Sequence, residues 1–372
     1  MKKALFICNT SYQILFTINF VSVMNEYEVG IFLTDTLPNA DKLKEKLFAL
    51  GCFLEVKIVK FKEMPRLSSY KKVICYYLQK YFNFNFVKVY FNPDFCYDEL
   101  YFANFNEEIA YIRRYLMKRN SNLITNMYED GFATYSSFYY ETLHEFLEPK
   151  NYVYKVIRKR IYDNYYAIKK MLVFNPQYMV WQTNKFKIEK IIFQSTKNSQ
   201  FVKQICDAFD VNTETDIIKQ KYIFFEESYC SDNREINDIE LVRIISDIVG
   251  KDNIYVKTHP RNKVNRFLKE GFITNIHSSA PWEIMAIINN LEDKVLFTIA
   301  SVSVLTPRVL FGVKYKGFML YKCAEPEDSL RQDIIPTYEQ IRNNFSNDVQ
   351  VPEKLKDMIQ LIKNDFENKE ST

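Results

Sequence analysis

The sequence is poor in glycine and histidine, since only 7 Gly and 3 His occur among its 372 residues. With so few histidines and no cluster of cysteines, a structural zinc site of the usual kind is excluded. The signatures of dinucleotide binding, P-loop phosphate binding, zinc proteases and serine hydrolases are missing too: G-x-G-x-x-G, G-x-x-x-x-G-K-[ST], H-E-x-x-H and G-x-S-x-G. So is D-x-D, the motif by which many sugar-nucleotide enzymes hold a divalent metal.

Charge and cysteine usage narrow the class of protein further. The 50 basic and 46 acidic side chains leave a net charge of +4, too small an excess for a nucleic-acid-binding protein. The 7 cysteines form no C-x-x-C pair and are odd in number, which fits reduced thiols in the cytoplasm. The apolar start is interrupted by Asn9, Thr10, Ser11 and Gln13, and no apolar run reaches 18 residues. We therefore expect a soluble cytoplasmic protein, at most peripheral on the inner membrane.

Short apolar runs alternate with amphipathic segments, which predicts parallel sheets covered by helices on both faces. The predicted strands are residues 4–8, 29–33, 54–61, 87–91, 100–103 and 123–128, then 222–225, 253–257, 272–276, 295–299 and 313–320. The predicted helices are residues 12–24, 41–50, 69–82 and 106–117, then 236–249, 282–290, 302–311 and 353–368. Because the pattern restarts, we predict two Rossmann-like domains facing a central cleft, over residues 1–215 and 216–345. Residues 346–372 form a C-terminal helix and tail.

Between the two halves, residues 152–170 combine six Lys and Arg with one Asp and several tyrosines. One interpretation is the solvated face of a helix. The other is a basic, aromatic surface that meets an anionic glycolipid or the inner membrane leaflet.

Four clusters of polar residues follow predicted strands, where open α/β sheets bind their ligands. Two are in the first half. Residues 9–13, N-T-S-Y-Q, lead into a helix and could serve only as its cap. Residues 128–131, Y-E-D-G, place Glu129 and Asp130 before a scarce glycine. Burial and the neighbouring like charge would raise the pKa of a carboxylate there toward that of a useful base.

The other two clusters are in the second half. Residues 257–261, K-T-H-P-R, flank His259 with two cations, and the imidazole could be held protonated beside a phosphate. Residues 300–303, A-S-V-S, offer hydroxyls and free N–H groups at a helix start, a typical anion site. His277 is expected in a loop and His144 in an amphipathic helix, and neither is predicted to be catalytic.

The E-D-G turn, the T-H-P-R run and the later serine pair, in this order, resemble the bacterial sialyltransferases. The closest resemblance is to glycosyltransferase family 52, the lipooligosaccharide sialyltransferase group, with a more distant one to bacterial polysialyltransferases. It implies the GT-B fold and transfer of sialic acid from CMP-sialic acid, with inversion, to a galactoside-type acceptor on lipooligosaccharide or capsule. It implies no metal, in keeping with the missing D-x-D, and no other cofactor.

The resemblance also implies roles for individual residues. His259 would contact or protonate the CMP phosphate as it leaves, Ser301 and Ser303 would bind that phosphate, and Glu283 would hold the ribose. The expected donor-binding set is Lys257, Pro260, Arg261, Glu283, Ser301 and Ser303. The expected acceptor-side set is Asn9, Thr10, Ser11, Gln13 and Gly131.

The sequence leaves more than one candidate for the general base. Asp130 or Glu129 is favoured, and Glu226 and Glu227, in I-F-F-E-E-S-Y, stay open because the aspartate of some relatives is not clearly aligned there. Two alternative functions also stay open: transfer from another sugar nucleotide, such as UDP-glucose or another CMP-nonulosonate, and glycan-assembly binding without catalysis. Formation of a homodimer and peripheral contact with the inner membrane also stay open.

Overall fold

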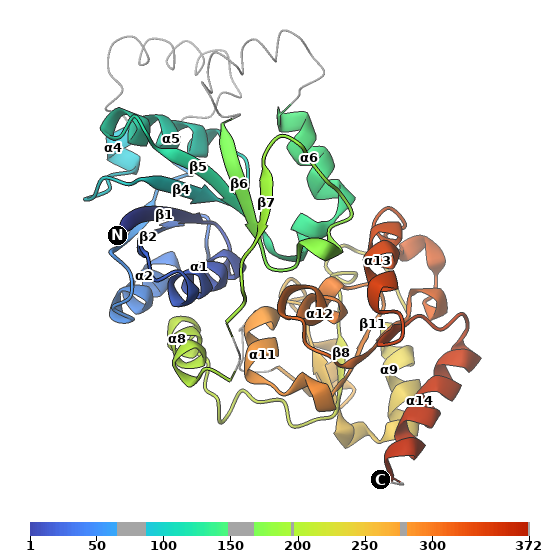
Figure 1. Cartoon of the computed structure of the whole chain (residues 1–372). Helices are drawn as coiled ribbons and strands as arrows, with labels where there is room; N and C mark the ends of the chain where they lie inside the picture. The colour runs from blue at the N-terminus through green and yellow to red at the C-terminus, as the bar shows by residue number, and fades with distance from the viewer. Residues whose placement is uncertain (65–86, 148–166, 195–196, 276–280, 371–372) are drawn as a thin grey trace. The chain divides into compact units, whose positions relative to one another are not determined.

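The computed structural model describes residues 1–64, 87–147, 167–194, 197–275 and 281–370. These residues form two compact units, Met1–Asp210 and Val211–Thr372, each with one parallel sheet (Figure 1). The two Rossmann-like domains predicted from the sequence are therefore confirmed. The predicted helix at 69–82, most of the basic stretch at 152–170, and His277 lie outside the described residues.

The first unit contains a seven-stranded sheet in the order β3-β2-β1-β4-β5-β6-β7. Its strands are β1 Lys2–Cys8, β2 Tyr27–Thr34, β3 Glu55–Val59, β4 Glu99–Phe102, β5 Ile124–Tyr128, β6 Ile168–Val173 and β7 Lys187–Lys190. Its helices are α1 Ser11–Val23, α2 Ala40–Ala49, α4 Val87–Tyr90, α5 Glu107–Arg119, α6 Ser137–Leu147 and α8 Ser199–Phe209, with short 3₁₀ turns η2 Gly131–Tyr135 and η3 Pro176–Tyr178. The strand order reverses between β1 and β4, the point at which such sheets bind ligands.

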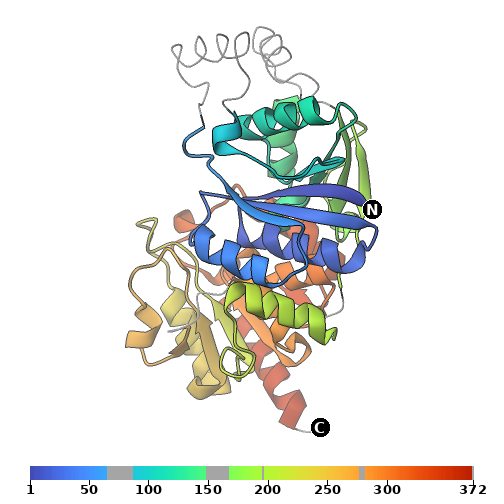
Figure 2. The ribbon, with the colours of Figure 1, turned by 90° about the vertical axis from the view of Figure 1, so that its left-hand side faces the viewer.

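Helices cover both faces of this sheet. The main apolar core lies on the face of α4, α5 and α6, and joins Ile112, Leu116 and Leu143 to Leu100 and Met127 of the sheet. On the other face α8 packs against α1 and α2, and Figures 1 and 2 agree in showing these three helices side by side. The sheet is thus buried on both sides, which explains its nearly continuous apolar strands.

The second unit contains a six-stranded sheet in the order β10-β9-β8-β11-β12-β13. Its strands are β8 Tyr222–Phe225, β9 Ile254–Lys257, β10 Ile273–Thr274, β11 Val295–Thr298, β12 Lys316–Met319 and β13 Val349–Gln350. Its helices are α9 Asp238–Val249, α10 Arg266–Lys269, α11 Trp282–Ile288, α12 Thr306–Phe311, α13 Ile335–Arg342 and α14 Leu355–Glu370. Its 3₁₀ turns are η4 Lys251–Asn253, η5 Leu291–Asp293, η6 Val302–Val304, η7 Tyr321–Cys323, η8 Glu327–Ser329 and η9 Asn343–Phe345. Here the order reverses between β8 and β11.

One predicted strand is wrong. Residues 87–91 were expected to be extended because of their β-branched and aromatic side chains, but Val87–Tyr90 is the one-turn helix α4. Val87 and Phe91 are buried and Val89 is 73% exposed, so the buried positions are spaced as on a helix. Phe91 inserts between Phe32 of the sheet and Tyr115 of α5, with ring centroids 5.0 and 5.8 Å apart.

Strands β6 and β7 have no counterpart in the sequence-based prediction. Edge strand β7 reads K-I-E-K, and Glu189 pairs with Lys187 (2.7 Å) and with Lys170 on β6 (3.2 Å). Charged edge strands of this kind prevent edge-to-edge aggregation, but they carry little apolar signal. No helix among the described residues is long and apolar enough to cross a membrane.

Candidate active site

In the first unit, three loops with polar side chains meet at the carboxyl edge of the sheet. They follow β1, β4 and β5, which are hydrogen-bonded neighbours in the sheet. Because all three strands are parallel, the residues after each strand lie close together. The loops after β4 and β5 contribute Asn104 and Asp130, and the first turn of α1, which follows the β1 loop, contributes Gln13.

Asp130 is held at this edge by two side-chain amides. Gln13 Nε2 donates to Asp130 Oδ1 (2.5 Å) and Asn104 Nδ2 donates to Oδ2 (2.7 Å), while the Asp130 N–H donates to Thr134 Oγ1 (2.6 Å). Burial raises the pKa of Asp130 above its usual value, and the two amides oppose the rise. Asp130 is only partly buried, in contrast to its neighbour Glu129.

Glu129, the neighbouring carboxylate, points into the protein and is 0% exposed. Its carboxylate accepts hydrogen bonds from the Tyr12 hydroxyl, the Tyr135 hydroxyl (2.6 Å) and the Phe174 N–H (2.9 Å). Burial is the main cause that raises the pKa of Glu129 from 4.5 to about 7, against these three donors. Glu129 therefore connects β5 to α1 and to the chain after β6.

Gly131 makes the turn after Asp130 possible. Its φ of 70° lies in the left-handed region that side chains rarely adopt, and a Cβ there would meet the Tyr12 ring at 3.4 Å. The rarity of glycine in this sequence thus pointed to a genuine backbone requirement.

The loop after β1 serves partly as the cap of α1. Thr10 is the N-cap and accepts from Gln13 N, and Asn9 N donates to Gln13 Oε1 (2.6 Å). Gln13 is 0% exposed, and its side-chain amide reaches Asp130 from within the protein. Ser11 is partly buried, and Asn9 Oδ1 is buried with no hydrogen-bond partner among the described residues.

In the second unit, Glu226 anchors the T-H-P-R run that follows β9. Its Oε2 accepts from His259 N (3.0 Å) and its Oε1 from Arg266 Nη2 (3.0 Å), which also pairs with Asp238. The Glu226 side chain is 0% exposed. An ion pair buried this deeply positions the backbone of the histidine loop.

His259 is half-buried, and its Nδ1 accepts from the Arg261 N–H (3.2 Å), so the ring proton of the neutral imidazole is on Nε2. Burial lowers the pKa of His259 below 6.5, with Arg261 as the next cause. In the protein alone these surroundings favour the neutral ring, and the expectation of an imidazole held protonated beside a phosphate stays a prediction. Pro260 and Arg261 are exposed, and Arg261 Nη2 donates to Ser228 Oγ (2.8 Å).

Glu227 joins the two strands at the reversal of strand order. Its Oε1 accepts from Ala300 N (2.5 Å) and Thr298 Oγ1 (3.2 Å), both at the end of β11. Burial raises the pKa of Glu227 from 4.5 to about 7, while these donors and Tyr229 lower it. Glu227 thereby fixes the start of the A-S-V-S segment.

The serine pair forms the cap of η6. Ser301 Oγ accepts from Ser303 N (3.2 Å) and lies 3.0 Å from Ser303 Oγ, while Ser303 O accepts from Trp282 Nε1 (2.8 Å). The Trp282 contact brings α11 and its Glu283 to this edge.

Lys257 and Glu283 interact electrostatically, although they come from β9 and α11. Burial lowers the pKa of Lys257 and raises that of Glu283, and each charge opposes the shift of the other. The predicted donor-side residues therefore gather around the ends of β8, β9 and β11.

Sequence reasoning missed Asn104, Arg266 and Thr298, which orient the predicted residues, and it noted Tyr12 only as part of the N-T-S-Y-Q run. Asn104 and Thr298 stand at or just past strand ends and could have been found by that position. Arg266 carried no such signal. Among the described residues, no group of three or more His, Cys, Asp and Glu side chains could hold a metal ion.

The alpha-2,8-polysialyltransferase (POLYST) family has a sequence model that matches this chain over residues 5–319. The chain belongs to this family. It is a sialyltransferase, a glycosyltransferase that uses CMP-sialic acid and whose partners are a nucleotide-sugar donor and a glycan acceptor. No curated protein matches the sequence.

Several solved glycosyltransferase structures are similar to this sialyltransferase. Spinosyn rhamnosyltransferase SpnG complexed with thymidine diphosphate has a TM-score of 0.46 at 8% identity, over 99% of this chain and 91% of that one. Medicago truncatula UGT71G1 complexed with UDP-glucose has 0.44 at 9%, over 99% and 94%. Acinetobacter baumannii MurG has 0.43 at 7%, over 99% and 90%. Likeness at this level says nothing about substrates.

The buried Glu129 makes the stability of the sialyltransferase depend on pH. Because its pKa is about 7 when folded and 4.5 ordinarily, the folded state binds the extra proton, and stability falls as pH rises between these values. The free energy of unfolding should drop by about 3 kcal/mol on this account between roughly pH 5 and 8. In Glu129→Gln, urea unfolding should show a smaller drop, since Glu227 contributes equally to both proteins. An unchanged difference between the two pH values would contradict this assignment.

Proposed function

We propose that this protein is an inverting sialyltransferase that works without a metal and extends a bacterial surface glycan. The sugar is transferred from CMP-sialic acid to a hydroxyl of a terminal sialic acid, in α-2,8 linkage, as the name of the family suggests. The likeness of the E-D-G, T-H-P-R and serine motifs to family 52 makes a galactoside the second candidate acceptor.

The observation that carries the proposal is the state of Asp130. It is the partly exposed residue of the two acidic residues in the E-D-G turn, both of its oxygens are oriented by amides, and burial raises its pKa. A carboxylate with two bound donors still has free lone pairs to accept a proton. Asp130 is therefore our general base for the acceptor hydroxyl. Glu129, which is buried and bound by three donors, is its support.

The reaction balances with these groups. The acceptor oxygen forms a bond to the anomeric carbon, the bond from that carbon to the CMP phosphate oxygen breaks, and Asp130 takes the hydroxyl proton. Attack on the face opposite the leaving phosphate inverts the anomeric centre. The oxocarbenium-like transition state places negative charge on the phosphate, where hydrogen-bond donors act most strongly.

The second unit supplies those donors in our proposal. His259 presents an Nε2–H because its Nδ1 already accepts from Arg261 N. Ser301 and Ser303 add hydroxyls, Lys257 and Arg261 add positive charge, and Glu283 is placed to accept from ribose hydroxyls. Glu226 and Glu227 hold the loops that carry these donors, which argues for support rather than base catalysis.

Incubation with CMP-sialic acid should release CMP and elongate an acceptor that ends in sialic acid. UDP-glucose should not be consumed. Mass spectrometry of the product, with linkage analysis by NMR, measures both the transfer and its position. Elongation of a terminal galactoside while the sialylated acceptor is left unchanged would overturn the acceptor assignment.

Replacement of the proposed base, Asp130→Asn, should lower kcat by roughly 10²–10⁴-fold. The amide cannot accept the proton, but its remaining oxygen can still accept from Gln13, and Asn104 can rotate its own amide to accept from the new NH₂ group. The exposed Asp207 on α8 gives the matched control Asp207→Asn, which should retain full transfer. If Asp130→Asn transfers at nearly the normal rate, Asp130 is not the base.

His259 is the proposed hydrogen-bond donor to the CMP phosphate, and His259→Ala should lower kcat by roughly 10²–10³-fold. His259→Gln should recover part of this loss, because its Nε2–H can reach a similar position. Thermal unfolding should show that both variants stay folded, since Glu226 is bound by the His259 backbone rather than by its ring. Equal rates of transfer by the wild type and both variants would remove His259 from the mechanism.

A further inference from the structure

Tyr139 lies near Asp130 although it belongs to none of the sequence motifs. It stands in the first turn of α6, where its N–H donates to Ser136 Oγ, just before the helix (3.2 Å). Its hydroxyl donates to Ala103 O, in the loop after β4 (2.8 Å). Tyr139 therefore joins α6 to the loop that carries Asn104, the residue that binds Asp130 Oδ2.

The hydroxyls of Tyr139 and Thr134 form a chain of hydrogen bonds whose direction is fixed. Thr134 is 0% exposed, its Oγ1 accepts from Asp130 N (2.6 Å), and its hydroxyl is hydrogen-bonded to that of Tyr139. Because the Tyr139 hydrogen is already donated to Ala103 O, the hydrogen between the two hydroxyls comes from Thr134. The chain therefore runs from the Asp130 backbone through both hydroxyls to the loop after β4.

The ring and the charge state of Tyr139 both keep this chain in place. The ring stacks on Trp181, with centroids 6.1 Å apart and planes at 26°, and Trp181 Nε1 donates to Thr134 O (2.7 Å). Burial raises the pKa of Tyr139, and the negative charge of Asp130 is the next cause. The phenol consequently keeps its proton over the pH range in which a carboxylate titrates, and it remains a donor to Ala103 O.

We propose that Tyr139 is a positioning residue for the general base: its hydroxyl holds the loop after β4 at the point where Asn104 reaches the Asp130 carboxylate. A hydrogen bond donated to a carboxylate favours its charged form, so the contact with Asn104 lets Asp130 act as a base at lower pH. The inference rests on the proposed function, because it takes Asp130 to be the base.

The test is Tyr139→Phe, which removes the hydroxyl and keeps the ring on Trp181. It should lower kcat roughly three- to tenfold. KM for CMP-sialic acid should stay the same, because the donor site is proposed in the second unit. The acidic limb of the kcat/KM profile should move to higher pH by about 0.5 or more, since Asp130 loses a donor and its pKa rises. Asn104→Ala should move the limb in the same direction, and the double variant should move it no further than Asn104→Ala does alone.

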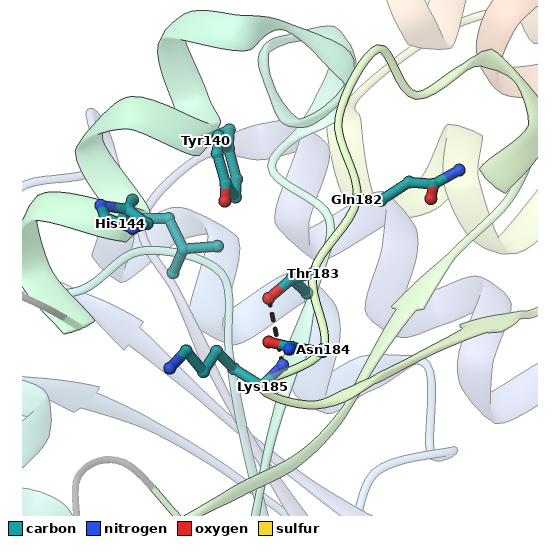
Figure 3. A pocket seen from close by; sticks show the side chains of 7 residues that line it. Tyr140, His144, Gln182, Thr183, Asn184 and Lys185 are labelled. Carbon is teal, nitrogen blue, oxygen red and sulfur yellow. Dashed lines mark hydrogen bonds between the residues drawn. The ribbon is translucent and has the colours of Figure 1, made fainter.

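The matched control is Tyr140→Phe. Tyr140 is the next residue on α6 and also stacks on Trp181, with centroids 5.3 Å apart. Its hydroxyl, however, points toward Thr183 in a pocket of about 440 Å³ that α6 forms with residues 182–185 (Figure 3). Loss of this hydroxyl should leave the acidic limb where it is in the wild type.

An unmoved limb in Tyr139→Phe would overturn the inference, since a loss of rate that is uniform in pH indicates a structural role alone. Shifts of the two single variants that add up in the double variant would overturn it as well. Titration of the Asp130 carboxyl by carbon-13 NMR, with Asp130→Asn to assign the signal, separates the two proposals. An Asp130 pKa that is unchanged in Tyr139→Phe is a failure of the positioning alone, whereas transfer by Asp130→Asn at the normal rate is a failure of the proposed base.

Discussion

Hydrogen bonds to the buried carboxylate of Glu129 fix the carboxyl edge of the sheet in the first unit. Buried at the end of β5, this carboxylate accepts from Tyr12 of α1, from Tyr135 of η2 and from the backbone after β6. Because Glu129 turns inward and Gly131 takes a left-handed φ, Asp130 between them is directed to the edge of the sheet. A buried carboxylate with fewer donors would be costly, so the three contacts and the partly exposed Asp130 belong to one arrangement.

The second unit also has two adjacent carboxylates directly after a strand, Glu226 and Glu227. Glu226 is buried and fixes the histidine loop and Arg266, while Glu227 reaches across to Ala300 and Thr298. In both units, buried carboxylates that follow a strand bind the loops after neighbouring strands. Those loops carry the side chains proposed for catalysis and donor binding. Glu129 and Asp130 are adjacent carboxylates of similar chemistry, so burial is what distinguishes them: Glu129 is fully buried and Asp130 is partly exposed.

Much of the fold could be predicted because parallel strands buried on both faces are continuous apolar runs. Residues 222–225 form a strand as predicted, and within each unit the chosen loops follow strands of one parallel sheet and lie at its carboxyl edge. Prediction failed where this signal was weak or had two interpretations. Val87–Tyr90 has strand-like composition but helical burial, and β7 is a charged edge strand whose Glu189 pairs with Lys170 of β6. Asn104 and Arg266 were missed because their importance comes from partners 26 and 40 residues away.

The sequence by itself determined the class of fold, the ordered motifs and the likeness to sialyltransferases, because these depend on local pattern and on residue type. Only the tertiary structure decided which residue of each motif is buried and holds neighbouring loops, and which is exposed to solvent. It buried Glu129 with three donors and left Asp130 partly exposed, and it favoured a neutral His259 through burial and the charge of Arg261. Protonation and exposure depend on what surrounds a group in space, and those surroundings come from residues far apart along the chain.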